Sequence, residues 1–396
     1  MNMQNQFKYF YERVTSNSEI ILITLLILFY LTEGATKTGI LSKSNTIGLQ
    51  AGLKIVVFIF TLLGLLIYKK RELLYIFSLV VIFILGQLFL ENNFDSSILI
   101  YGAKYIFPIA LLGFFSVELR APKVKLLNTF ENILLVNSIL IIIGLVFDIS
   151  YFNTYRGDRF GYNGLLISSS ISTYFYMIGV SCFFIRYHNK VITNWKFWIV
   201  SLSALFVGTK SLVFGLILLI FFYALKHVQF SKTRWITLII GFVIAFGFSY
   251  YLFFINPLFH SLSKTHGFFS SFLSLRDQLL IFHTLPFVSE NWSIWNYFFG
   301  GTSNFELRPQ MELLDVIFFW GILGGLSYLI FFYKSFFKNF SISNVNIISP
   351  AIGYSLVLLC LIAFITGNFF YNSSVVIYMI VLRENIVYTY SLQSHK

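Results

Sequence analysis

Two acids at the start of an apolar run are the residues best suited to proton transfer. Glu312 and Asp315 stand three positions apart in Met-Glu-Leu-Leu-Asp, so a helix here would place both carboxylates on one face. Asp315 would lie one turn inside a membrane-length run, where an ionised group is costly and usually partnered. A carboxylate shielded from water can take a proton from a hydroxyl group, so either acid is a candidate general base. The alternative is an acid stabilised by the helix dipole, which explains Glu312 better than Asp315.

Four basic residues are candidates for binding an anion. Arg156 and Arg159 flank Asp158 in a glycine-containing segment, Lys210 follows Gly-Thr, and Arg276 follows Ser-Leu. Arginine supplies paired hydrogen bonds to phosphate oxygens, and lysine supplies a compact charge. The glycines beside the first two arginines allow tight turns and close approach of a ligand. Together, these residues predict a site for a phosphate or pyrophosphate group.

Each of these basic residues also has a purely structural interpretation. Asp158 could pair with its neighbours in a turn, Lys210 could extend from a helix end toward water, and Arg276 could pair with Asp277 or a lipid phosphate. A polar stripe after Asn163 favours function for the first segment. It consists of Ser168, Ser169, Ser170, Ser172 and Thr173. Such a stripe is typical of a helix that faces a wet cavity instead of lipid.

The segment after Leu273 is predicted to begin a helix. Ser274 is typical of an N-cap, and Asp277 would place an acid in the first turn. The apolar residues through Phe287 predict a helix that lies in the membrane interface. Three aromatic residues that follow it suit an interfacial belt: Trp292, Trp295 and Tyr297.

Metal, nucleotide and thiol chemistry are not indicated. His260, His266 and His283 lack metal-ligand spacing on one face, and Cys182 and Cys360 lie inside apolar runs. The sequence contains no Walker A, dinucleotide-binding or nucleophile-elbow pattern. We therefore predict neither a metal nor a cofactor.

Membrane helices must position these candidate residues. The chain is 57% hydrophobic, 20% aromatic and 11% charged, whereas a soluble domain is about 25% charged. Its continuously apolar runs exclude a β-barrel and predict an all-α polytopic membrane protein of about 12 transmembrane helices. The expected spans lie near 20–33, 48–68, 73–90, 98–117, 130–148, 164–185, 195–208, 211–225, 235–255, 313–333, 347–366 and 371–390. Within this single transmembrane domain, 1–396, the long interruption 256–312 is predicted to be a large periplasmic loop containing interfacial helices.

Basic residues determine the predicted orientation. With a cytoplasmic N-terminus and an even number of spans, the short inner loops are almost uniformly basic, as the positive-inside rule requires. This pattern accounts for most of the net charge of +12, so no nucleic-acid partner is predicted and both termini are expected to be cytoplasmic. Arg383 and Glu384, near the inner end of the last span, are expected to neutralise each other. Some basic residues fall on the outer side and so are exceptions to this rule: Lys37, Lys43, Arg156, Arg159, Lys210, Lys264, Arg276 and Arg308.

The chain resembles the Wzy-type O-antigen polymerases of the O-antigen polymerase and ligase superfamily. The resemblance depends on the layout of the spans and on four short elements. They are the arginine-glycine loop 156–161, the Gly-Thr-Lys-Ser turn, the outer loop from Arg276, and Met-Glu-Leu-Leu-Asp-Val leading into Phe-Trp-Gly-Ile-Leu-Gly.

This resemblance implies a reaction and roles for the candidate residues. A glycan on undecaprenyl pyrophosphate is transferred to the non-reducing end of another lipid-linked unit, on the periplasmic side of a bacterial inner membrane and without a metal. The basic residues would hold the pyrophosphate leaving group; they are Arg156, Arg159, Lys210 and Arg276. Glu312, or Asp315 as second choice, would deprotonate the acceptor hydroxyl. The partners implied are the lipid-linked donor and acceptor and membrane lipids, and a chain-length regulator is left open.

Two alternatives are weaker. An O-antigen ligase or another lipid-linked glycosyltransferase shares this chemistry, but related ligases usually carry a histidine where the large loop meets the next span, and this chain has Glu312 there. Lys210 stands where relatives often have arginine, which weakens its expected paired hydrogen bonding. A transporter or lipid-linked glycan flippase would favour internal repeats and polar residues at the bilayer midplane, whereas the polar candidates here gather at the outer face.

Overall fold

The computed structural model is built from helices. It describes residues 17–90, 97–115, 123–155, 159–227, 255–337 and 350–394, together with single positions between 235 and 251. Within these ranges there is no strand, only an isolated antiparallel bridge between Asn153 and Tyr162. The predicted all-α class is therefore confirmed for the described part of the chain.

Among the residues that the structure describes, six helices are long and apolar enough to cross a membrane. They are α2 (Ser18–Ser42), α3 (Leu49–Tyr68), α4 (Lys70–Leu88), α5 (Ser97–Phe115), α6 (Val124–Val146) and α15 (Glu312–Phe337). Shorter apolar helices accompany them: α8 (Trp195–Phe206), α9 (Lys210–His227) and α16 (Pro350–Thr366). These are the features of a helical membrane protein. Each predicted span coincides with a helix except the one near 235–255, which lies largely outside the described residues.

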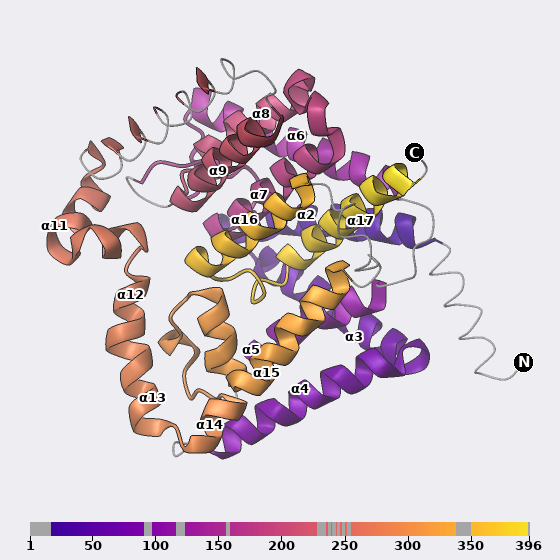
Figure 1. Cartoon of the computed structure of the whole chain (residues 1–396), viewed down its shortest axis with the longest axis vertical. Helices are drawn as coiled ribbons and strands as arrows, with labels where there is room; N and C mark the ends of the chain where they lie inside the picture. Colours follow the sequence, from indigo (N-terminus) through magenta and orange to yellow (C-terminus); the bar gives the residue numbers. More distant parts are fainter. Residues whose placement is uncertain are drawn as a thin grey trace, which may run out of the picture.

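Two less apolar helices, α7 (Ser169–Tyr187) and α17 (Val375–Ser394), pack against each other inside the molecule (Figure 1). In α7 every side chain from Ile171 to Ile185 is buried. Because protein instead of lipid surrounds these helices, they accommodate hydroxyl, amide and charged groups. Both begin later than the sequence predicted. Gly164 is itself left-handed (φ 65°) and precedes α7, and the left-handed Gly367 (φ 59°) and Asn368 (φ 63°) begin the connector between α16 and α17.

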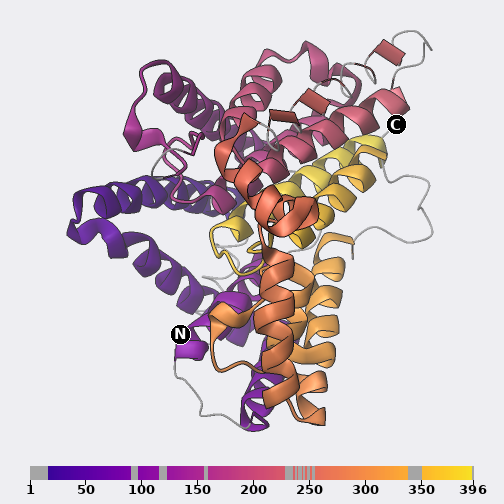
Figure 2. The same ribbon diagram turned by 90° about the vertical axis from the view of Figure 1, so that its left-hand side faces the viewer.

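The segment 256–312 is largely helical and runs along one side of the molecule, from α9 toward the end of α4 (Figures 1 and 2). Asn256 accepts a hydrogen bond from the backbone N–H of Phe259 and so caps the first helix. The helices of this segment are α11 (Pro257–Phe272), α12 (Arg276–Leu279), a π-helical turn η5 (Leu280–Thr284), α13 (Leu285–Asn291), α14 (Ile294–Phe299) and a 3₁₀ turn η6 (Phe305–Leu307).

The predicted N-cap at Ser274 is wrong. Ser274 (φ 57°) and Leu275 (φ 65°) are both left-handed, and Leu275 precedes α12 without a capping side chain. The chain reverses sharply here between α11 and α12, and Ser270 closes the turn instead. Its carbonyl accepts from the N–H of Leu275 at 2.8 Å, and its hydroxyl donates to Asp277. The helical stretch through Phe287 is nevertheless present as α12, η5 and α13.

Trp292, one of the expected aromatic belt residues, is used inside the protein. Its indole N–H donates to the carbonyl of Gly301 at 2.9 Å, and its ring stacks on Phe318. Trp295 and Tyr297 are exposed and remain available to the membrane interface. The interfacial role of these two residues stays a prediction.

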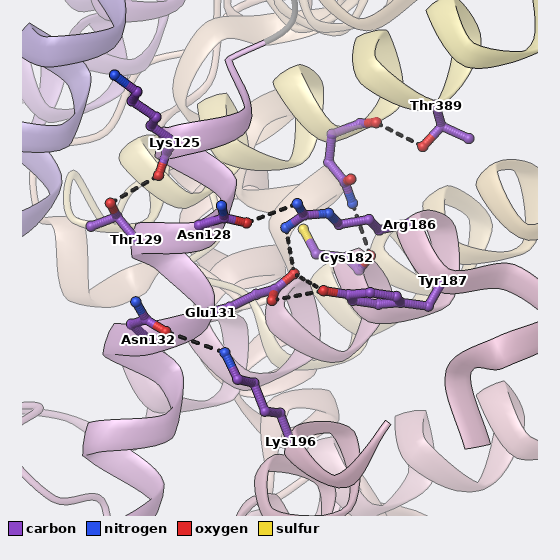
Figure 3. A network of polar contacts seen from close by, with 11 residues as sticks. Lys125, Asn128, Thr129, Glu131, Asn132, Cys182, Arg186, Tyr187, Lys196 and Thr389 are labelled. Atoms are coloured by element: carbon purple, nitrogen blue, oxygen red, sulfur yellow. Dashed lines mark hydrogen bonds and ion pairs between the residues drawn. The ribbon is translucent and has the colours of Figure 1, made fainter. Parts of the chain in front are cut away.

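Ion pairs at the C-terminal end of α7 neutralise buried charges. Arg186 donates to Glu131 at 2.7 Å, within a network that Figure 3 shows between α6 and α7. Arg383 contacts Glu384 at 2.9 Å, which confirms the predicted pair, and Lys123 also reaches Glu384 at 2.8 Å. The charges of Lys123, Arg186 and Arg383 are therefore paired with carboxylates. These pairs lie at the end of the bundle opposite to Ser169, which begins α7.

Candidate functional site

A cavity of about 280 Å³ lies where α7 and α9 begin and where α11 and α16 end. Its wall consists of Tyr155, Arg159, Ser169, Ser170, Thr173, Thr209, Lys210, Ser211, Phe214, Phe272, Ser274, Arg276, Gln310, Ile362, Ile365, Thr366 and Asn368. Three of the four predicted anion-binding residues are in this wall: Arg159, Lys210 and Arg276. Arg156 lies outside the described residues.

Three cations line the cavity, while Asp315, which interacts with Arg276, lies outside the wall. No carboxylate occurs in the wall as far as the structure describes it. Burial of three cations near one another is unfavourable without a negative partner. The arrangement therefore suits an anionic ligand.

Aromatic rings position Arg159 and Lys210. The guanidinium of Arg159 lies 3.7 Å from the ring centre of Tyr155, and the Lys210 ammonium lies 4.0 Å from that of Phe259. Lys210 also donates to the carbonyl of Ser271 at 2.5 Å. The Nε of Arg159 is buried and has no protein partner. Both cations thus keep donors available to a ligand.

Arg276 is fixed by two carbonyls. It donates to Leu273 at 3.2 Å and to Thr366 at 2.9 Å, so it joins the start of α12 to the end of α16. Its Nε is buried without a partner. Burial lowers the pKa of Arg276, whereas Tyr174 and Asp315 nearby raise that pKa. An arginine stays protonated in a protein, so a permanent positive charge lies at the cavity wall.

Part of the predicted polar stripe on α7 lines this cavity. Ser169, Ser170 and Thr173 are in the wall, which confirms the expectation of a cavity-facing helix for these residues. Thr173 donates to the hydroxyl of Thr209 at 3.0 Å and so connects α7 with the turn before α9. Ser172 is buried and donates to the carbonyl of Ser168 within its own helix.

Close backbone packing holds the turn that carries Lys210. The N–H of Tyr162 donates to the carbonyl of Phe206 at 2.8 Å, and Thr154 donates to Val207 at 2.9 Å. Gly208 (φ 77°) lies against the carbonyl of Phe160, where an added Cβ would overlap the oxygen. The turn therefore requires glycine at this position.

We expect Gly208→Ala to lower the free energy of unfolding by about 2 kcal/mol, because alanine is strained at a positive φ and lacks space here. Thermal melting of the purified protein in detergent measures this change. Gly353→Ala is the matched control, since an added Cβ in α16 would meet nothing within 4 Å. Equal melting midpoints for the two variants would contradict the tight turn.

The two predicted acids lie behind the cavity wall, and neither lines it. Glu312 accepts from the backbone N–H groups of Phe369 at 2.7 Å and Phe370 at 2.8 Å, so both of its oxygens are engaged. Asp315 pairs through Oδ2 with Arg308 at 3.0 Å, and its buried Oδ1 has no partner. A base role for either acid stays a prediction.

Asn368 is a site residue that the sequence did not single out, and Arg308 was noted only as an outer basic residue without a role in the site. Arg308 is buried, contacts Asp315, and donates to Oδ1 of Asn368 at 2.6 Å. Asn368 in turn lines the cavity. Two signals pointed to Arg308: it is an exception to the positive-inside pattern, and it lies shortly before the two acids in Arg-Pro-Gln-Met-Glu.

A second buried polar cluster holds the irregular segments before α7 and α17. Lys37 donates to Asn163 at 2.5 Å and to the carbonyl of Gly164 at 2.7 Å. Glu33, on the same helix, accepts from Ser374 at 2.5 Å and from the N–H of Ile167 at 3.3 Å. Polar side chains of α2 therefore form hydrogen bonds with backbone groups that have no partner within a helix.

Among the described residues, no group of histidine, cysteine and carboxylate side chains is arranged to hold a metal ion. Comparison of the chain with protein-family models, with curated proteins and with solved structures finds no match.

Proposed function

We propose that this protein binds the pyrophosphate of a lipid-linked glycan in the cavity and transfers the glycan to a second lipid-linked unit, as O-antigen polymerases do. The observation that carries the proposal is the meeting of Arg159, Lys210 and Arg276 in one cavity wall without a carboxylate. In glycan transfer, negative charge develops on the departing pyrophosphate. Fixed cations that contact it there lower the barrier to transfer.

The size and lining of the cavity support a headgroup as the bound species. A volume of about 280 Å³ is at the lower end of small-molecule sites, which suits a pyrophosphate better than a whole repeat unit. Hydroxyl donors of Ser169, Ser170 and Ser211 accompany the cations. The sugars would then extend beyond this cavity.

Apolar residues on the same wall support a lipid-linked ligand. Phe214, Phe272, Ile362 and Ile365 come from α9, α11 and α16 and lie beside the cations. A soluble phosphate would gain nothing from these side chains, whereas the first units of a polyprenyl chain would bury apolar surface against them.

The distribution of basic residues supports the periplasmic side of the inner membrane. The cavity lies at the start of α7, whereas Arg186 lies in the last turn of that helix and Lys123 precedes α6. The positive-inside rule assigns the end with Lys123 and Arg186 to the cytoplasm. The cavity would then face the periplasm, with both termini on the opposite side.

The acceptor hydroxyl must lose a proton as the new glycosidic bond forms. Of the two proposed bases, Glu312 accepts backbone hydrogen bonds with both oxygens, and Asp315 pairs through Oδ2 with Arg308. Asp315 is separated from the cavity by Arg308 and Asn368. The acceptor would approach from that side.

The test is incubation of the purified protein with a synthetic lipid-pyrophosphate repeat unit, without nucleotide or added metal. We expect a ladder of longer lipid-linked oligosaccharides on a gel, and its loss in Lys210→Ala. Lys264→Ala is the matched control, because Lys264 is an exposed lysine of α11 outside the cavity wall. A unit that stays monomeric but crosses a proteoliposome bilayer would replace the polymerase proposal with a transporter.

A further inference from the structure

The backbone that follows α16 is held on both sides of Asn368, at Thr366 and Gly367 and at Phe369 and Phe370. Arg276 binds the carbonyl of Thr366, and Tyr174 donates to that of Gly367 at 2.5 Å. Glu312 accepts from the N–H groups of Phe369 and Phe370. Asn368, between them, is left-handed (φ 63°), a conformation that asparagine tolerates better than most residues. A segment fixed in this way holds the Asn368 side chain in one place.

Arg308 determines which end of the Asn368 amide faces the cavity. Arginine has only hydrogen-bond donors, so the atom that it contacts at 2.6 Å must be the amide oxygen of Asn368. The amide nitrogen then carries two N–H donors that Arg308 does not use, on a residue that lines the cavity. This assignment follows from the chemistry of the partner and does not depend on choosing between oxygen and nitrogen by their positions.

Arg308 itself is held rigidly. It pairs with the buried Asp315 at 3.0 Å, and its guanidinium lies 4.2 Å from the ring centre of Phe305 and 4.8 Å from that of Tyr371. It does not line the cavity. Its hydrogen-bond contact with the cavity wall is therefore made through Asn368.

We propose that Asn368 donates a hydrogen bond to the phosphate group bound in the cavity, and that Arg308 and Asp315 are positioning residues for this amide. The inference rests on the proposed function. In it, Asn368 is a neutral hydrogen-bond donor to the pyrophosphate, beside the three cations. A neutral donor adds specificity for phosphate oxygens without adding a further charge to a buried cationic site.

The first test exchanges donor for acceptor at Asn368. Asn368→Asp keeps the shape of the side chain and the contact with Arg308, but presents a carboxylate oxygen to the ligand. We expect the Kd of the purified full-length protein for inorganic pyrophosphate, measured by calorimetry in detergent, to rise at least about tenfold. The ligand-free melting midpoint should be unchanged. Asn372→Asp, in the same segment but outside the cavity wall, should bind as the wild type does.

The second test separates positioning from a general structural role. Arg308→Lys cannot contact Asp315 and Asn368 with the geometry of a guanidinium, so it should also raise the Kd. If Arg308 acts through the amide, the combined Arg308→Lys and Asn368→Asp variant should be no weaker than Asn368→Asp alone. Additive losses in the combined variant would overturn the positioning role.

Outcomes of these tests distinguish the inference from the proposed function. If Lys210→Ala weakens pyrophosphate binding and Asn368→Asp does not, the inference is overturned and the proposed function stands. If binding depends on Asn368 but no glycan is polymerised, the inference stands and the reaction is overturned. Farnesyl pyrophosphate is the second probe: tighter binding than inorganic pyrophosphate supports a lipid headgroup at Asn368, and equal binding supports a free anion there.

Discussion

Arg276→Ala is expected to reduce the rate of glycan transfer by about 10²–10³-fold, which is the usual effect of removing one fixed donor from a developing negative charge. Arg276 is the cation that the structure immobilises most firmly, through the carbonyls of Leu273 and Thr366. Its Nε is buried without a protein partner. The measurement is the initial rate of ladder formation at saturating lipid-linked unit.

Arg276→Lys separates charge from geometry at this position. Lysine keeps the positive charge but cannot hold two carbonyls and present a further N–H in the same plane, so we expect little rescue of the rate. Lys264→Ala, on an exposed residue of α11, controls for the loss of a cation elsewhere in the segment 256–312. A rate within twofold of the wild type for Arg276→Ala would remove this residue from the leaving-group site.

Glu312→Ala is expected to be the most destabilising of the single changes considered. It leaves the N–H groups of Phe369 and Phe370 without an acceptor, and each unsatisfied buried N–H costs about 1–3 kcal/mol. Glu312→Gln keeps one acceptor oxygen and should lose about half as much. Melting midpoints in detergent should therefore fall in the order wild type, glutamine, alanine.

This order distinguishes an anchor from a general base. If Glu312 were a base without a structural role, both variants would lose activity equally, and both would melt at the same midpoint as the wild type. Glu306→Ala, at an exposed acid of the segment 256–312, controls for loss of charge. Unchanged melting of Glu312→Ala would contradict the anchoring role and return Glu312 to the catalytic candidates.

The fold could largely be predicted from apolar run length, because a bilayer requires about 20 apolar residues for each crossing helix. The starts of α7 and α17 could not be placed from this signal. Gly164 lies inside the predicted span 164–185, and Asn368 begins a connector that is longer than predicted; polar groups from α2 and α15 satisfy the irregular backbone at these places. Such partners are distant in sequence, so the local pattern contains no trace of them.

The candidate site was predictable in its chemistry but not in its arrangement. Arginine and lysine at the outer ends of spans indicated an anion, and Arg159, Lys210 and Arg276 do meet in one wall. The amide of Asn368 gave no signal, because an asparagine after a glycine looks like an ordinary turn residue. For Glu312, composition and spacing suggested a base, whereas its two backbone partners become visible only in three dimensions.

The connector from Thr366 to Val375 is tied at both ends by buried carboxylates on different helices. Glu312 of α15 binds Phe369 and Phe370, and Glu33 of α2 binds Ser374. The number of residues between these two contacts therefore determines the distance between α2 and α15. A single inserted residue would force one carboxylate to release its partner, so natural length variation should be tolerated elsewhere in the chain and rejected here.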